Sequence, residues 1–405
     1  MEVQQIYQLV NEATKEAIGK ADLLAEDLSN IVEVGDEIQN LRKIENYTRS
    51  LVDHIGKTIF VNRPYSGAVP SILMDGWQYG SILEKIATQL PEATENESWE
   101  LQDGQSYDPN IFYKPEVIAK FYNSKTTWEI PMSFAERQVR SAFDSATQVN
   151  ALMSMLTTSI DSSATIKQEE LIMRTINNFT ADTFYKAFPS GGYGDAVGNA
   201  MCVNLLKMYN DRYHPGGTGL LAAEDAVTDP DFARFAAYIM RLYVRRMQKM
   251  SVNFNIGKQP RFTPADRLHV VMLADFSEAA DIFLQSNVYH NEMLKLPEAD
   301  FVPYWQAQGN GTEAGSAGAY TYDNITGIKV KTKNTGGSTI NPTGILAVMF
   351  DHEALGVCNV DRRVTTNYNP KAEFFSNWYK FEAQYFNDHN EQFVVFYVAD
   401  PTPTP

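Results

Sequence analysis

The chain has 405 residues, of which 44% are hydrophobic and 21% are charged. This composition is ordinary for a folded protein of about two to four domains, and it excludes a mainly disordered or collagen-like chain. The 34 basic residues are outnumbered by 50 acidic ones, which gives a formal net charge of −16. Because tight binding to nucleic acid depends mainly on basic side chains that neutralise phosphates, the acidic net charge argues against a protein that binds nucleic acid tightly.

Cysteine content and the start of the chain bear on location. Cys202 and Cys358 are too few for a disulfide framework and are typical of buried thiols. The first twenty residues are charged and periodic rather than apolar, so we expect no signal peptide. No apolar run approaches the roughly 20 residues that span a bilayer. The sequence therefore predicts a protein that is made and used in a cytoplasm.

Residues 1–55 predict two helices. Apolar residues recur at spacings of three and four over 6–32 and again over 38–55, and Gly35 separates the two runs. This segment has an apolar stripe but too little mass for a core of its own. We therefore expect it to form an arm that lies on another part of the assembly.

Residues 57–133 have a different character. Short β-like pieces at 58–62 and 127–132 bracket an acidic, turn-rich stretch. An excursion of about 75 residues without helices is unusual in a compact domain, and a two-stranded hairpin is marginal in isolation. We therefore expect its aromatic side chains to dock on another subunit. The candidate intersubunit contact residues are Trp77, Tyr79, Trp99, Tyr107, Phe112, Tyr113, Phe121, Tyr122 and Trp128.

Helical periodicity returns near Ser133. If the turn-like residues 161–163 do not break it, the run over about 145–180 predicts a rod of roughly 50 Å at 1.5 Å per residue. A second amphipathic helix is predicted after Asp229-Pro230. The last turns of this helix carry basic residues that suit the negative end of the helix dipole. These residues are Arg241, Arg245, Arg246 and Lys249.

The last third of the chain predicts buried strands. Continuous apolar runs occur at 268–273, 344–350 and 393–398. Ser277 can cap a helix that follows the first of them. Between the first two strands, residues 307–343 are rich in glycine, threonine and asparagine, which is typical of loops with short strands.

No nucleotide or catalytic motif is complete. Gly56-Lys57-Thr58 contains the end of a phosphate loop, but that motif needs a glycine five positions before Gly56, where this chain has Leu51. The glycines at 191–198 have the wrong spacing for a dinucleotide loop, and no strong strand precedes them. We therefore predict no catalytic residues and no cofactor.

The densest candidate metal cluster is Asp351-His352-Glu353. The zincin pattern fails there because position 356 is a glycine where a second histidine is required. A strand end with solvated polar residues explains the cluster at least as well, and we predict no metal site. The basic residues that end the second helix could touch nucleic acid, but helix-end electrostatics and intersubunit salt bridges explain them more simply.

This order of parts resembles the major capsid proteins of tailed bacteriophages with the Hong Kong 97-like fold, especially those of small short-tailed, podovirus-type phages. EVGDEIQN followed by SLVDHIGKTIFVNR is similar to their junction of arm and E-loop. LHVVMLADFSEAADIFL is similar to their axial-domain unit, and ILAVMFDHEALGV with NWYKFEAQYFND and FVVFYV is similar to their final sheet. The resemblance extends over about residues 30–400.

The resemblance implies an α+β fold with an N-terminal arm, an extended β-hairpin loop (the E-loop), a peripheral domain with a long spine helix, and an axial domain. The expected ranges are 1–56 for the arm, 57–133 for the E-loop, 134–224 and 346–398 for the two parts of the peripheral domain, 225–345 for the axial domain, and 399–405 for a disordered tail.

The implied function is self-assembly into an icosahedral shell around packaged double-stranded DNA, with the chain located in the virion and assembled in the host cytoplasm. The implied partners are further copies in pentamers and hexamers, a separate scaffolding protein, a portal protein and DNA through weak non-specific contact, without a membrane. Two alternatives stay open. One is a cytoplasmic hydrolase with an Asp/Glu/His site near 351–353, and the other is a phage tail or cement protein.

Overall fold

The computed structural model describes residues 72–74, 83–88, 116–135, 146–189, 191–195, 197–286, 297–306, 322–331 and 336–400, with isolated positions between 90 and 114. The predicted arm and the Gly56-Lys57-Thr58 segment lie outside these residues. No helix within the described ranges is both long enough and apolar enough to cross a membrane.

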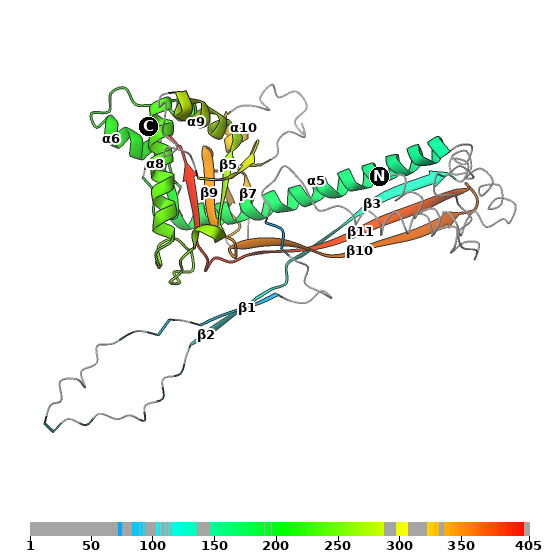
Figure 1. Ribbon diagram of the computed structural model, residues 1–405, viewed down its shortest axis with the longest axis horizontal. Coiled ribbons are helices and arrows are strands. Elements are labelled where there is room, and N and C mark those ends of the chain that lie inside the picture. Colours follow the sequence, from blue (N-terminus) through cyan, green and yellow to red (C-terminus); the bar gives the residue numbers. More distant parts are fainter. Residues whose placement is uncertain are drawn as a thin grey trace.

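The longest element is the helix α5 (Ala146–Ala187), which runs alongside a three-stranded sheet (Figure 1). Its 42 residues correspond to about 63 Å at 1.5 Å per residue. The helix predicted over about 145–180 is therefore confirmed, and residues 161–163 do not interrupt it. Threonine hydroxyls inside α5 donate to carbonyls one turn earlier, as Thr175 Oγ1 does to Leu171 O at 2.8 Å, so these buried polar groups are satisfied within the helix.

The three-stranded sheet is antiparallel, with the order β10-β11-β3. Side chains alternate along the central strand: Tyr379 and Phe381 are buried, while Lys380 between them is partly exposed. Phe381 stacks on Trp128 of the neighbouring strand with ring centroids 6.0 Å apart. The bounds are β3 (Lys125–Ala135), β10 (Leu355–Asn369) and β11 (Phe374–Asn387).

A second sheet has five strands in the order β4-β12-β9-β5-β6. Its strands are β4 (Cys202–Asn204), β5 (Leu268–Leu273), β6 (Asp300–Val302), β9 (Ile345–Asp351) and β12 (Phe393–Tyr397). Every residue of β9 and β12 is buried, which explains why both read as continuous apolar runs. The three buried strands predicted at 268–273, 344–350 and 393–398 are confirmed, with ends that shift by at most one residue.

Helices cover both faces of β12. Phe179 of α5 packs on Phe393 with ring centroids 4.1 Å apart, and Tyr243 of α8 (Pro230–Met247) meets Phe396 edge to face at 5.2 Å. The predicted start of α8 is confirmed, because the Asp229 side chain accepts a hydrogen bond from Phe232 N at 2.7 Å. Among the described residues, the further helices are α6 (Leu205–Tyr213), α7 (Ala223–Ala226), α9 (Ala274–Ser286) and α10 (Tyr322–Thr326). A 3-10 turn, η3 (Ala265–Arg267), precedes β5. Strands β7 (Val330–Lys331) and β8 (Thr339–Ile340) pair as a small antiparallel sheet.

Two sequence-based helix starts are wrong. Strand β5 passes directly into α9 at Ala274, so Ser277 lies inside the helix, buried, and does not cap it. The helix predicted from Ser133 does not begin there, because β3 continues to Ala135, whose partner in β11 is Phe374. In both places the end of the strand depends on its pairing with other strands, which the local sequence does not show.

A two-stranded ribbon projects away from the rest of the molecule (Figure 1). It consists of β1 (Leu83–Thr88) and β2 (Val117–Tyr122), which pair antiparallel with Leu83 opposite Tyr122 and Thr88 opposite Val117. We call it the ribbon. It lies inside the predicted excursion 57–133.

The five-stranded sheet takes its strands from several parts of the chain. The five-stranded sheet takes β4 from 134–224, β5 and β6 from 225–345, and β12 from 346–398. The chain enters this sheet, leaves it to form β10 and β11, and returns to it with β12. Hydrogen bonding between strands that are distant in sequence therefore joins segments that the expected boundaries separate.

Candidate functional site

The two faces of the ribbon differ in chemistry. Its exposed face carries three large apolar side chains, Ile86, Val117 and Phe121, which are 62%, 57% and 62% exposed. The register places Phe121 opposite Glu84 and Ile86 opposite Ala119, so the three apolar groups share one side. We call this side the outer face. A single exposed apolar residue needs no explanation, but three on one projecting element indicate a surface made for a partner.

The inner face of the ribbon contacts the body of its own chain. Tyr122 lies against Phe386 of β11 with ring centroids 5.2 Å apart. On the same face, Lys85 and Lys120 stand opposite each other in the register. Both lysines reach the turn between β11 and β12, where Asp388 and Glu391 lie.

These four charged residues form what we call the ribbon root. Lys85 Nζ lies 2.9 Å from Asp388 Oδ2 and 2.7 Å from Glu391 Oε1, and Lys120 Nζ lies 3.0 Å from Asp388 Oδ1. Each carboxylate oxygen of Asp388 thus has its own lysine, although the Asp388 side chain is only 2% exposed. The nearby Arg261 Nε is 3.3 Å from Glu391 Oε1. The ribbon is therefore fixed to the body through buried ion pairs.

Local backbone structure holds Asp388 in position. Its N–H donates to Ala354 O at 2.7 Å, and its Oδ1 accepts from Asn390 N at 3.0 Å. Glu391 N donates back to Asp388 O at 3.1 Å, which closes the turn. The acidic half of the root is therefore preformed by the β11–β12 turn, and the ribbon supplies the basic half.

Electrostatics reinforces this pairing. Burial alone would raise the pKa of Asp388, but Lys85 and Lys120 outweigh it and hold the pKa at about 2, below the ordinary 3.8. Burial alone would lower the pKa of Lys85, yet Asp388 and Glu391 raise it above 10.5. Burial, with the charge of Asp388, also raises the pKa of the Tyr122 hydroxyl. At neutral pH Asp388 and Lys85 are therefore charged and paired with each other.

The nine predicted contact residues have different places. Phe112 is 85% exposed, and Phe121 belongs to the outer face. Tyr122 and Trp128 instead pack on Phe386 and Phe381 of the chain's own body, because both stand on the strand faces that point inward. The remaining candidates, Trp77, Tyr79, Trp99, Tyr107 and Tyr113, lie outside the described residues.

Sequence reasoning missed the ribbon root. Lys120 interrupts an otherwise apolar strand and Lys85 follows Glu84 in a mixed one, which is a weak signal in a chain with 34 basic residues. It gains meaning only when the register brings the two lysines together on one face. Ile86 and Val117 were also missed, because the sequence analysis counted only aromatic side chains.

The cluster at 351–353 is engaged in contacts that suit a strand end. His352 Nδ1 lies 2.9 Å from His269 Nε2, and Glu353 pairs with Arg267 at 3.0 Å. Burial, and then the neighbouring His352, lowers the pKa of His269. In the described part of the chain no three His, Cys, Asp or Glu side chains are grouped so that they could hold a metal ion. The glycines at 191–198 lie in the connection between α5 and β4.

The described residues thus combine an exposed apolar face on a projecting ribbon with a charged root that holds this ribbon to the body. The model of the Phi29-like phage major capsid protein family matches residues 9–397 of this chain. The chain therefore belongs to the Phi29-like phage major capsid proteins.

Solved structures with similar chains are also phage capsid components. The capsid structure of Staphylococcus phage Andhra is 10% identical, with 84% of this chain and 87% of that chain covered and a TM-score of 0.48. The capsid structure of cyanophage P-SCSP1u is 11% identical, with 84% and 93% covered and a TM-score of 0.42. The comparison with curated proteins finds no match. Because these TM-scores are below 0.5, the family model carries the assignment.

The phage major capsid protein family predicted from the sequence is thus confirmed, and the helices and sheets of the described residues agree with the predicted α+β class. The chain is a phage major capsid protein, a structural component of the virion that builds the capsid shell. Neither the hydrolase nor the tail or cement alternative finds support in this match.

Proposed function

We propose that the ribbon belongs to the E-loop of this capsid protein and that its outer face docks on a neighbouring copy during shell assembly. The observation that carries the proposal is the division of the ribbon into two faces. One face is held by the chain's own Asp388 and Glu391, while the other presents Ile86, Val117 and Phe121 to solvent.

The energy of this contact is modest for one copy and large for a shell. Fully burying a Val, Ile or Phe side chain contributes roughly 1.5–3 kcal/mol, so the exposed parts of these three supply about 1–2 kcal/mol each. A stable protein interface buries about 800 Å² per partner, which is more than three side chains provide. We infer that the ribbon is one of several contacts that act together in closed rings.

Further features of the proposal follow from the family resemblance. We infer an arm at 1–56, an E-loop at 57–133, a peripheral domain from 134–224 and 346–398, an axial domain at 225–345 and a tail at 399–405. The partners are further copies in pentamers and hexamers, a separate scaffolding protein and a portal protein, and assembly takes place in the host cytoplasm. The net charge of −16 favours only weak, non-specific contact with packaged DNA.

We also infer that the chain has no catalytic role. The acidic residues of the 351–353 cluster are engaged in contacts within the chain: Asp351 Oδ1 accepts from Glu353 N at 2.9 Å, and Glu353 pairs with Arg267. Such pairing suits a structural strand end rather than the hydrolase site of the alternative reading.

The test is the double variant Val117→Asp with Phe121→Asp. We expect circular dichroism to show a folded subunit and electron microscopy to show no closed shells, because two carboxylates would have to be buried at the contact. Val252→Asp is a single-site control, since Val252 is another exposed valine, 42% exposed, that does not belong to the ribbon strands. Closed shells from the double variant at the yield of the unmodified chain would overturn the proposal.

A further inference from the structure

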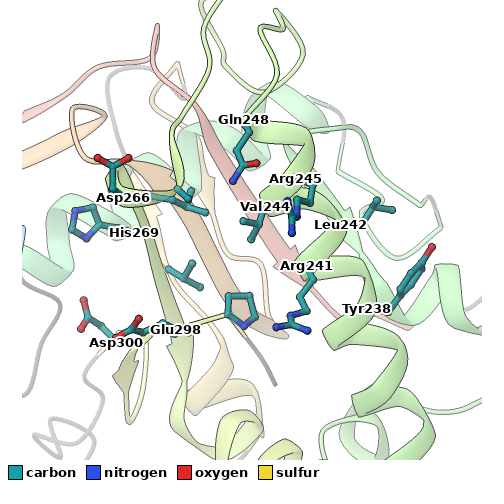
Figure 2. A pocket seen from close by; sticks show the side chains of 15 residues that line it. Tyr238, Arg241, Leu242, Val244, Arg245, Gln248, Asp266, His269, Glu298 and Asp300 are labelled. Carbon is teal, nitrogen blue, oxygen red and sulfur yellow. The ribbon is translucent and has the colours of Figure 1, made fainter. Parts of the chain in front are cut away.

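A wide groove lies between helix α8 and the edge of the five-stranded sheet. It has a volume of about 1000 Å³. Arg241 and Arg245 of α8 form one wall, and Glu298 and Asp300 form the opposite wall where the chain enters strand β6 (Figure 2). Asp266 of the turn η3 closes one end. We call this the α8 groove.

The exposed face of α8 continues past the groove. Arg234, Tyr238, Arg241 and Arg245 recur at spacings of three and four, so they form one stripe along the helix, the α8 stripe. Tyr238 is 55% exposed and borders both the α8 groove and a second hollow lined by Tyr213 and Arg212 of the helix α6 region. Tyrosine and arginine are the residue types that most often dominate the energy of protein interfaces.

The arrangement of charges selects the kind of partner. Phosphates of DNA would be attracted by the arginines, but Asp266, Glu298 and Asp300 on the other side of the groove would repel them. A small anion would leave most of a broad, open groove unfilled. A protein surface of mixed charge with exposed acidic groups matches both walls.

A second copy of this chain is such a surface. Each copy carries a net charge of −16, so copies repel one another unless basic patches lie at their contacts. The α8 stripe is a basic patch of this kind, in which Arg234 pairs with Asp231 at 2.7 Å while Arg241 and Arg245 line the groove. Ring-forming contacts are heterologous, which means that one patch on a copy meets a different patch on the next.

We propose that the α8 groove and the α8 stripe bind a surface of mixed charge on a neighbouring copy, as an intersubunit contact separate from the ribbon. This inference rests on the proposed shell-forming function. Arg241 and Arg245 pair with carboxylates of the neighbour, and Tyr238 is buried between the two copies.

The first experiment compares two charge reversals at different places in the chain. Arg241→Glu with Arg245→Glu changes the α8 stripe, whereas the control Lys186→Glu with Lys371→Glu makes the same change of net charge on exposed residues outside α8. We expect the stripe variant to lose about tenfold or more of its shells by sedimentation, and the control to assemble within about twofold of the unmodified chain. Melting temperatures check that both fold.

The second experiment measures access to position 238. Cys202 and Cys358 are buried, so a thiol reagent reports on Tyr238→Cys alone. In the unassembled ribbon variant, Val117→Asp with Phe121→Asp, the new thiol should react fast. In assembled shells the same thiol should react at least about tenfold more slowly.

The outcomes separate this inference from the proposed function. A stripe variant that assembles as well as its control overturns the inference and leaves the ribbon proposal intact. The same conclusion follows if the thiol at position 238 reacts as fast in assembled shells as in the unassembled ribbon variant. A thiol already protected in the unassembled variant means that the chain's own residues cover the groove, which also overturns it. A stripe variant that assembles but retains less DNA reassigns the arginines to DNA. Shells formed by the ribbon variant overturn the ribbon proposal instead.

Discussion

Strand β9 and the ribbon use the same backbone conformation for opposite purposes. All seven residues of β9 are buried, whereas none of the six residues of β1 or of β2 is. Apolar side chains in β9 stabilise the subunit. Ile86, Val117 and Phe121 contribute little to it, because more than half of each remains exposed. An apolar residue in this chain can therefore belong to the fold of one copy or to the contact between copies, and the burial of its strand tells which.

The largest expected effect comes from the core. Phe396→Ala removes a fully buried ring that meets Tyr243 of α8, so we expect a loss of about 3–5 kcal/mol in the free energy of unfolding. Urea denaturation followed by fluorescence measures it. A loss below about 1 kcal/mol would mean that β12 is not part of the cooperative core.

The ribbon root should respond to acid. The pKa of Asp388 is about 2 in the folded chain and 3.8 ordinarily, so its charge stabilises the folded state above about pH 4, and this stabilisation disappears as the pH falls towards 2. A difference of this size corresponds to about 2 kcal/mol. Hydrogen exchange of β1 and β2 should accelerate over that range.

Asp388→Asn provides the control for this acid response. The variant cannot lose a proton at that position, and its ribbon should exchange faster already at neutral pH, with little further change between pH 4 and pH 2. If the unmodified chain shows no acceleration of the ribbon in that interval, the ion pairs of the root do not hold it to the body.

Deleting residues 90–108 should affect assembly much more than stability. In the chain this segment falls between the two ribbon strands, β1 and β2. We expect a folded subunit with a melting temperature close to that of the full chain and with few shells in electron micrographs. An unfolded product would show that the segment belongs to the subunit's own core.

The smallest effect on stability is expected for Phe121→Ala. The ring is 62% exposed, so the free energy of unfolding should change by less than about 0.5 kcal/mol. Assembly should nevertheless weaken, which sedimentation of mixtures at several concentrations would detect. A stability loss as large as that of Phe396→Ala would erase the contrast between the ribbon and the core.

The sequence analysis succeeded where the signal is local. The long helix α5, the start of α8 at Asp229 and the three buried strands follow from periodicity, capping and continuous apolar runs. Local patterns do not tell which way a side chain points where its direction depends on strand pairing. Tyr122 and Trp128 are aromatic like Phe121, yet they point inward, because strand residues alternate between faces and the register decides which face is covered.

The family, the α+β class and the order of the elements were determined by the sequence alone, because each rests on residues that are neighbours in the chain. The ribbon root and the α8 groove were decided only by tertiary structure. Lys120 and Asp388 are 268 positions apart, and Arg241 faces Glu298 across a sheet edge built from separate segments. Charge pairs and grooves of this kind have no pattern along the chain, since they exist only after long-range packing has placed their members together.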